Sequence, residues 1–355
     1  LFLSCVHNLS MSRRVNAARG ATLNTTSTRF DDLAREADGD WLDSVAEDDL
    51  PSFRTEISYE TPRTAITRNT SPDLSFDRSI NAYRGCEHGC VYCFARPTHA
   101  YLGLSPGLDF ERRLTVKRSI PELLRKELEN PRYECRPMAL GTNTDPYQPV
   151  EGKYGTTRKI LEILSETNHP VMITTKSARV MRDIDILAPM AERGLAAVMV
   201  SVTTLDPETA KTLEPRATAP HRRIAAVKAL VEARVPVSVS LAPLIPAIND
   251  HEIEAILEAA AKAGAGMASM ILIRLPHEVS PIFRAWLDAN MPDRAARVMA
   301  HIREMRGGKD NEGSFHARFK PQGAYAAMIR ARFQAGCRRF GLTRRDIPLR
   351  TDLFS

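Results

Sequence analysis

Apolar residues are grouped along this chain in short runs that alternate with amphipathic stretches. The runs are long enough for strands buried on both faces, as in a parallel sheet, and they cover residues 80–83, 138–141, 171–175, 197–203, 237–243 and 267–274. Stretches with helical spacing of apolar residues separate them, at residues 120–128, 158–167, 180–193, 222–233 and 253–263. Strand and helix units repeated in this way predict an α/β fold, a partial (β/α)6 TIM-like barrel whose strands end at one common mouth.

The flanks of this repeat differ from it in charge. Residues 31–60 hold eleven Asp or Glu against Arg35 and Arg54, and residues 1–30 hold four Arg and no acid. We expect a flexible, disordered acidic N-terminal extension over residues 1–54, with a transit peptide as the alternative for its beginning and Met11 as a candidate start. The barrel core is expected over residues 55–280 and a basic helical C-terminal region over residues 281–355.

Composition limits the class of protein. The chain has 355 residues, of which 43% are hydrophobic and 26% charged, enough to bury one large core. No apolar run approaches the roughly 18 residues that a membrane-spanning helix needs, so no membrane partner is expected. Six cysteines, three of them clustered, suit a reducing compartment, and the cytoplasm is the expected location.

Three cysteines, Cys86, Cys90 and Cys93, form a C-x3-C-x2-C pattern just after the first predicted strand. Three thiolates so close together can bind three irons of a [4Fe-4S] cluster and leave the fourth iron open. A zinc site would need a fourth ligand, and His88 is the only nearby candidate. Disulfides are less consistent with three thiols in a chain of this length. Cys5, Cys135 and Cys337 lie apart from this group, and no role is assigned to them.

The stretch Asn81–Gly85 together with Cys86–Pro97 resembles the radical S-adenosylmethionine (SAM) superfamily, in particular the branch related to spore photoproduct lyase and often labelled "DNA repair photolyase". The resemblance extends from about residue 55 to about residue 275. It implies that the open iron binds SAM, and that the reduced cluster cleaves it to a 5′-deoxyadenosyl radical. The same resemblance implies the partial barrel, and an electron donor such as ferredoxin or flavodoxin.

The resemblance also indicates which strand ends would bind the cofactor. Tyr92, before the third cysteine, would present its backbone to adenine. The other candidates follow successive strands: Thr142, Asn143 and Thr144 in place of a common Gly-Gly-Glu, then Lys176, Ser201 and Arg216. An arginine fork suits the methionine carboxylate. Each has a structural alternative, since Ser and Thr at strand ends often cap helices, Tyr92 can simply shield a cluster, and Arg216 can pair with Glu214 or Asp206.

Two departures separate this chain from the lyase itself. The lyase resemblance predicts a hydrogen-donating cysteine after the second strand and a tyrosine after the third cluster cysteine. The chain has Gly141-Thr142-Asn143-Thr144 and Phe94 at these places. We therefore do not expect thymine photoproduct lyase activity, and the sequence leaves the choice between lyase and transferase chemistry open.

The substrate is the least constrained part. Residues 294–350 hold fourteen Lys or Arg against four acids, interleaved with aromatic residues, as a nucleic-acid surface requires. The alternative is that helices near 295–305 and 323–340 close the barrel with aromatics inward, and a peptide or protein substrate competes with nucleic acid. The segment from Arg96 to Lys117 is expected to lie over the mouth. An alternative function is an iron–sulfur nucleic-acid-binding protein with a structural cluster and no radical chemistry.

Overall fold

A computed structural model describes residues 19–25, 27, 29, 54–343 and 347–355. Its main element is a seven-stranded sheet with the order β10-β9-β8-β7-β6-β3-β2. Six of these strands run parallel: β3 (Arg78–Ile80), β6 (Met138–Leu140), β7 (Val171–Thr175), β8 (Ala196–Ser201), β9 (Val237–Leu244) and β10 (Met267–Leu272). The short β2 (Thr67–Arg68) pairs antiparallel with β3 at the other edge.

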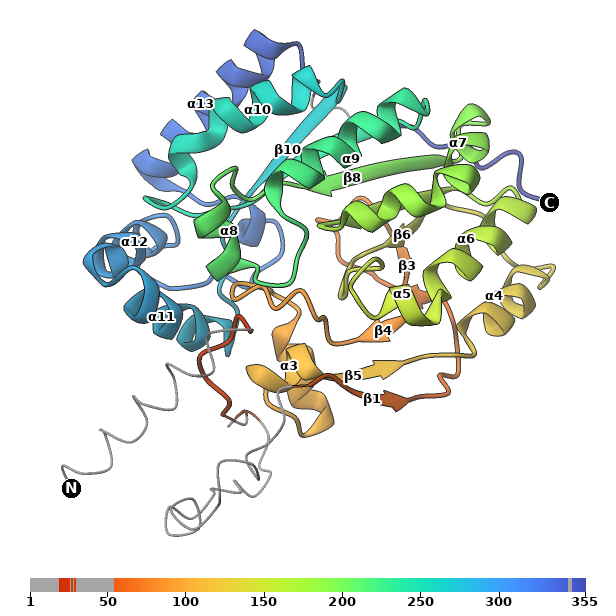
Figure 1. Cartoon of the computed structure of the whole chain (residues 1–355), viewed down its shortest axis with the longest axis horizontal. Helices are drawn as coiled ribbons and strands as arrows, with labels where there is room; N and C mark the ends of the chain where they lie inside the picture. The colour runs from red at the N-terminus through yellow and green to blue at the C-terminus, as the bar shows by residue number, and fades with distance from the viewer. Residues whose placement is uncertain (1–18, 26, 28, 30–53, 344–346) are drawn as a thin grey trace.

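Helices cover the outside of the sheet (Figure 1). They follow the strands in chain order: α4 (Ile120–Leu128), α5 (Glu151–Tyr154), α6 (Thr156–Glu166), η3 (Ala178–Asp183), α7 (Ile184–Glu192), α8 (Pro207–Leu213), α9 (Pro220–Glu232), η4 (Asp250–Glu252) and α10 (Ile253–Lys262). The apolar faces of α6 and α10 are buried, with Ile253, Ile256, Leu257 and Ala260 all within the main core. The predicted alternation of parallel strands and helices is confirmed.

Some element bounds differ from the predicted ones. The first predicted strand is divided between β3 and β4 (Tyr83–Arg84), and the third predicted helix begins as the 3-10 helix η3 before α7. β4 belongs to a second, three-stranded sheet with β5 (Arg113–Val116) and β1 (Glu56–Tyr59), which the apolar pattern did not predict. This small sheet, with η2 (Arg96–Leu102) and α3 (Leu108–Arg112), lies beside the first strand of the barrel.

The C-terminal region is helical, as predicted. It contains α11 (Val279–Asn290), α12 (Pro292–Glu304), η5 (Ala317–Phe319) and α13 (Gly323–Phe340). α13 packs against α10, and Phe333 is buried in the main core, whereas Phe315 is exposed. Phe333 thus faces inward, as the barrel-closing alternative predicts, and the binding of nucleic acid by this region stays a prediction. Among the described residues, no helix has the length and apolar character to span a bilayer.

Most of the acidic extension lies outside the described residues. Residues 19–25 are described, and they are not free of the rest of the chain: Arg19 and Ala21 are buried. Figure 1 shows this red segment between α3 and α11. The expectation of a flexible extension over residues 1–54 did not include such a packed segment. The described residues after it, 55–343 and 347–355, contain the strands and helices given above.

Candidate functional site

The cysteine loop begins directly after β4, at the edge of the barrel where the parallel strands end. Gly85 turns the backbone with φ of 75°, and the next residue, Cys86, donates its backbone N–H to the carbonyl oxygen of Phe110 at 2.9 Å. A Cβ at Gly85 would lie 2.7 Å from Leu114 Cδ2, so a larger residue has no room there. Glycine thus provides both the turn and the close approach that start the loop.

One buried arginine holds the loop from the inside. Arg96 donates hydrogen bonds to the carbonyl oxygens of Cys90 at 2.8 Å and Gly89 at 3.1 Å. Its remaining N–H groups reach the carbonyl oxygens of Pro106 and Gly107, and the guanidinium is paired with the fully buried Glu111. The planar fork of arginine allows one side chain to fix this much backbone.

All three cysteines are free thiols, with Cys86 and Cys90 buried and Cys93 half-buried. Burial raises the pKa of the Cys90 thiol to about 12, so iron would have to displace its proton. His88, the fourth ligand that a zinc site would need, instead lies with Nδ1 3.4 Å from Asp145 Oδ2. Three thiolates are the number of protein ligands that a [4Fe-4S] cluster with one open iron uses. In the structure, no three His, Cys, Asp or Glu side chains of the described residues are grouped as ligands of a single metal ion, so the cluster at these cysteines stays a prediction.

The loop after β6 approaches the cysteine loop through Asn81. The Asn81 side chain accepts the backbone N–H of Asn143 at 3.1 Å and lies 3.2 Å from Thr142 Oγ1. Thr144 is buried and donates its hydroxyl to the carbonyl oxygen of Gly85 at 2.7 Å. Of the three predicted residues, Thr144 therefore holds the start of the cysteine loop, whereas the Asn143 side chain is exposed.

Asp145, the carboxylate that follows Thr142, Asn143 and Thr144, links three parts of the mouth. It accepts the backbone N–H of Lys176 and the Thr175 hydroxyl, each at 2.7 Å, and faces His88. Lys176 is thereby fixed at the end of β7, with Nζ 5.8 Å from the centre of the Tyr92 ring. Lys176 and Tyr92, both predicted to bind the cofactor, thus lie side by side. Asp145, which holds the backbone of Lys176, belongs to the loop after β6.

A buried polar network lies behind Tyr92. Its hydroxyl contacts Thr203 and Glu214, and Glu214 is paired with Arg223 of α9. Burial by itself would raise the pKa of Glu214, but the charges of Arg223 and Lys176 outweigh it and hold that pKa at about 2. Burial together with the neighbouring Cys90 and Glu214 keeps the pKa of the Tyr92 phenol well above its usual range. The Tyr92 phenol is therefore neutral, and its hydroxyl donates a hydrogen bond to Glu214 behind the loop.

Ser201 and Arg216 have different surroundings. Ser201 ends β8, is buried, and accepts a hydrogen bond from Arg223 Nη1 on its carbonyl oxygen at 3.2 Å. Arg216 donates to Glu87 Oε1 at 3.0 Å, and its backbone N–H to the carbonyl oxygen of His88 at 3.2 Å. Arg216 thus reaches the cysteine loop itself, and the expected alternative partner Glu214 lies in the buried network instead.

The N-terminal segment closes one side of the cysteine loop. The backbone N–H groups of Gly20 and Ala21 donate to the two oxygens of Glu111 at 2.9 and 2.7 Å, and Arg19 donates to its carbonyl oxygen at 2.8 Å. A Cβ at Gly20 would lie 1.7 Å from the carbonyl oxygen of Gly89. The sequence indicated nothing of the site before Arg54, because Gly20 and Ala21 bind through backbone N–H groups, which leave no pattern in the sequence, and a single arginine is not distinctive.

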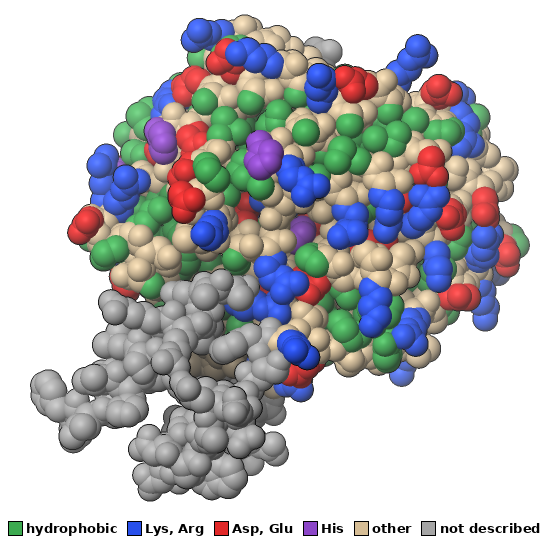
Figure 2. Space-filling model, viewed as in Figure 1, with side chains coloured by type: hydrophobic (Ala, Val, Ile, Leu, Met, Phe, Trp, Pro, Cys, Tyr) green, Lys and Arg blue, Asp and Glu red, His purple; other side chains and the backbone are tan. Residues whose placement is uncertain are grey.

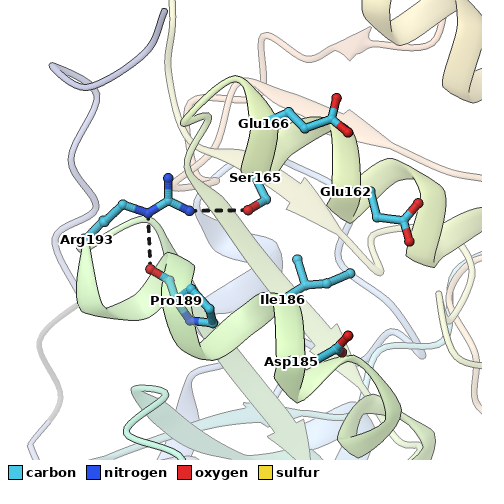
Figure 3. Close-up of a pocket in the computed structure, with 7 residues that line it drawn as sticks. All are labelled: Glu162, Ser165, Glu166, Asp185, Ile186, Pro189 and Arg193. Atoms are coloured by element: carbon cyan, nitrogen blue, oxygen red, sulfur yellow. Dashed lines mark hydrogen bonds between the residues drawn. The ribbon is translucent and has the colours of Figure 1, made fainter.

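A pocket elsewhere on the molecule does not belong to this site. It lies between α6 and α7 on the outside of the barrel (Figure 3). Arg193 there donates to the carbonyl oxygen of Pro189 and to Ser165 Oγ, with three carboxylates around it, Glu162, Glu166 and Asp185. None of the predicted site residues lines this pocket.

Relatives of the chain are found in bacteria and archaea. An uncharacterized protein of Mycobacterium bovis is 36% identical over 226 residues, which cover 63% of this chain and 66% of that protein. An uncharacterized protein of Methanocaldococcus jannaschii is 27% identical over 174 residues, which cover 49% of this chain and 62% of that protein. The matched region thus spans less than two thirds of either relative.

The fold is similar to that of spore photoproduct lyase. The structure of that enzyme complexed with dinucleoside spore photoproduct matches with a TM-score of 0.58 and 15% identity, covering 81% of this chain and 80% of the lyase. A mutant of the lyase with bound AdoMet and dinucleoside spore photoproduct matches with a TM-score of 0.56 and 16% identity, with the same coverage. The family model of the radical SAM superfamily matches residues 80–260, more than half of the chain. This chain therefore belongs to the radical SAM superfamily.

Proposed function

We propose that this protein is a radical SAM enzyme in which Cys86, Cys90 and Cys93 bind a [4Fe-4S] cluster. The observation that carries the proposal is the fixed loop of three free thiols at the mouth of the barrel, beside polar groups from the ends of β6, β7 and β8. When bound, the reduced cluster would cleave SAM to a 5′-deoxyadenosyl radical that abstracts hydrogen from the substrate. The family implies both cofactors.

The chain contributes rigidity to this chemistry. Arg96 fixes the carbonyl oxygens of Gly89 and Cys90, and Thr144 fixes that of Gly85, so the start and the middle of the cysteine loop are held before a cofactor binds. A site held in its working geometry loses less entropy on binding and admits less water. The apolar residues around Cys90 and Tyr92 form a second hydrophobic core, which would keep water away from the cluster.

The residues at the strand ends divide into two groups. Lys176 Nζ, the Asn143 amide and the Ser201 hydroxyl are the groups we propose for direct contact with SAM, together with the backbone at Tyr92 and the hydroxyl of Thr142. Arg216 is held by Glu87 but remains one third exposed, so its fork can also reach a carboxylate. Thr144, bonded to Gly85, positions the loop instead.

The class of reaction is hydrogen abstraction from a substrate that we propose to be a nucleic acid. Support comes from the lyase of similar fold, which is complexed with a dinucleoside photoproduct. Two features argue against the lyase reaction itself. Phe94, which has no hydroxyl, is half exposed beside Cys93, and Cys135 lies just before β6, at the end of that strand remote from the mouth. We also propose a ferredoxin or flavodoxin as the electron donor and the cytoplasm as the location.

The experiment is anaerobic reconstitution with iron and sulfide, followed by electron paramagnetic resonance of the reduced protein with and without SAM. We expect the cluster signal to change on addition of SAM and 5′-deoxyadenosine to accumulate. Cys93→Ala removes a proposed iron ligand and should abolish both signals. Cys337→Ala is its matched control, because it removes a cysteine that is buried in the main core away from the mouth.

The alternative of a structural cluster makes the opposite prediction. A cluster that assembles but leaves its signal unchanged with SAM, with no 5′-deoxyadenosine, would replace the radical proposal by an iron–sulfur binding protein. A protein that takes up zinc and no iron would overturn both.

A further inference from the structure

Three arginines converge where the sheet is open. Arg274 follows β10, one edge strand of the seven-stranded sheet, and Arg318 is paired with Asp73, which lies in the connection from β2, the other edge strand, to β3. Arg306 donates to the carbonyl oxygens of Leu272 and Ile273, at the end of β10. The arginines therefore bridge the two edges of the incomplete barrel.

Aromatic rings are interleaved with these cations. The Arg274 guanidinium lies 4.7 Å from the centre of the Phe319 ring, and Arg318 lies 5.1 Å from the ring centres of both Phe319 and Phe315. Phe315 is the outermost member and is 56% exposed, although it is a large apolar ring. Cation and ring thus alternate from the barrel opening outward, and an aromatic face is left open to solvent.

The positive charge of this group is not balanced by the described residues. Arg318 has Asp73 as its carboxylate partner, and the pKa of Asp73 is held at about 2 by the Arg318 guanidinium. Burial lowers the pKa of Arg306 and outweighs the negative charge of Glu312, which raises that pKa. Arg274 makes no ion pair among the residues that the structure describes, and its buried Nε, like that of Arg306, has no hydrogen-bond partner there.

Basic side chains are also grouped in another region, where several of them are paired with acids. Figure 2 shows Lys and Arg side chains gathered over α5 and α6. In that region Arg158 is paired with Asp183 and Asp185, and Arg182 with Glu151. Burying an unpaired guanidinium is costly, and burial with the charges of Arg318 and Arg306 lowers the pKa of Arg274 to about 10. An anion bound to Arg274 would remove this cost.

The segment that carries Arg274 is packed against the hydrophobic core behind the cysteine loop. Ile273 and Leu275, on either side of Arg274, pack in the same hydrophobic core as Cys90 and Tyr92 of the cysteine loop. A ligand held by Arg274 would therefore bind to a segment that also packs against the core of the cysteine loop. This makes the group a candidate site for substrate rather than for an unrelated anion.

We propose that Arg274, Arg306 and Arg318, with Phe315, form a binding site for a single-stranded nucleic acid at the open edge of the barrel. The Arg274 guanidinium, whose Nε has no partner among the described residues, would bind a backbone phosphate, and Arg306 and Arg318, held by their own partners, would add positive charge beside it. The exposed face of Phe315 would stack on an unpaired base, which a duplex does not offer. This inference rests on the proposed function, because it names the substrate class of that enzyme and the route by which the strand reaches the mouth.

The test is fluorescence anisotropy of a labelled single-stranded oligonucleotide with the reconstituted full chain, at several salt concentrations. For Arg274→Gln we expect about tenfold weaker binding and a salt slope reduced by about 1, and for Phe315→Ala about tenfold weaker binding with the slope unchanged. Lys262→Gln is the matched control, because it removes one exposed charge from the last residue of α10 and should leave the affinity unchanged.

Thermal unfolding distinguishes binding from a structural role. Arg274→Gln should unfold at the same temperature as the wild type or higher, since it removes an unpaired charge, whereas a structural arginine would lower it. Equal affinities of Arg274→Gln and Lys262→Gln would overturn the inference, and so would a polyglutamate of equal length that binds as tightly as the oligonucleotide. Formation of 5′-deoxyadenosine by the wild type without oligonucleotide tests the proposed function separately, so that either can fail alone.

Discussion

Arg96 donates from Nε to the carbonyl oxygen of Cys90 at 2.8 Å, and both residues are buried. The contact joins η2 to the middle of the cysteine loop and makes the position of one proposed iron ligand depend on a single guanidinium. Glu111 neutralises that guanidinium and also binds the N-terminal segment at Gly20 and Ala21. The cysteine loop, η2, α3 and the N-terminal segment are thus coupled through one ion pair.

Replacing Arg96 by lysine should therefore weaken both stability and iron binding. An ammonium group cannot reproduce the fork that reaches the carbonyl oxygens of Cys90, Gly89 and Gly107, and the cost is expected to be about 2–4 kcal/mol in the free energy of unfolding. Urea unfolding and iron content after reconstitution measure the two effects.

The control for Arg96→Lys is Arg84→Lys. Arg84 is paired with Glu60 in a half-exposed ion pair, where the same change should alter the free energy of unfolding by less than about 1 kcal/mol. If Arg96→Lys bound iron as fully as Arg84→Lys, the loop would not depend on the guanidinium.

Gly20→Ala should release the N-terminal segment. The added Cβ would fall 1.7 Å from the carbonyl oxygen of Gly89, so the segment must move away from the loop and lose its hydrogen bonds to Glu111. We expect faster hydrogen exchange in the cysteine loop and faster loss of iron to a chelator. Gly266→Ala is the control, since nothing lies within 4 Å of the Cβ it would add. Equal rates of iron loss in the two variants would show that the segment does not protect the loop.

The barrel could be predicted from the sequence because its strands are buried on both faces. In β8, five of the six residues are buried, and a strand that is buried on both faces has apolar residues at successive positions. In β1, three of the four residues are exposed, so the sequence has no apolar run there. The pairing of β1 with β5 was therefore not predicted. The packing of Gly20 and Ala21 could not be predicted either, because it depends on backbone N–H groups and a carboxylate 90 residues away.

The sequence indicates the three candidate cysteines directly, but it shows little of what surrounds them. The spacing of Cys86, Cys90 and Cys93 is local, so it can be read from the sequence without knowledge of the fold. Partners of charged side chains are not local: Arg216 is paired with Glu87, 129 residues away. Arg96 was expected over the mouth, but its side chain is buried against the cysteine loop. The sequence does not show which carbonyl oxygens accept hydrogen bonds from a buried guanidinium.

Glu214→Gln should be strongly destabilising, because it leaves Arg223 buried without its carboxylate. Removing one partner of a buried ion pair costs about 3–5 kcal/mol, whereas replacing both by apolar residues often costs less. The double variant Glu214→Gln/Arg223→Met should therefore be more stable than the sum of the two single effects predicts. Urea unfolding of the four proteins measures this coupling, and additive effects would mean that Arg223 finds another partner.

Below neutral pH, the protein should lose stability through His169. Its ring is fully buried, with Nε2 2.8 Å from the Tyr133 hydroxyl and Nδ1 3.0 Å from the carbonyl oxygen of Pro170, and burial lowers the pKa of His169 to about 4. The unfolded chain, with a histidine pKa of about 6.5, then binds more protons than the folded one between these values.

The stabilising contribution of neutral His169 is therefore complete above pH of about 6.5 and is lost as the pH falls to about 4, with a total near 3 kcal/mol. His169→Asn should be less stable at neutral pH but lose less free energy of unfolding over this range, as measured by urea unfolding at a series of pH values. His251→Asn, at an exposed position on η4, should keep the wild-type dependence. If the wild type and His169→Asn showed parallel curves, His169 would titrate alike in the folded and unfolded states, and the acid sensitivity would have to come from other groups.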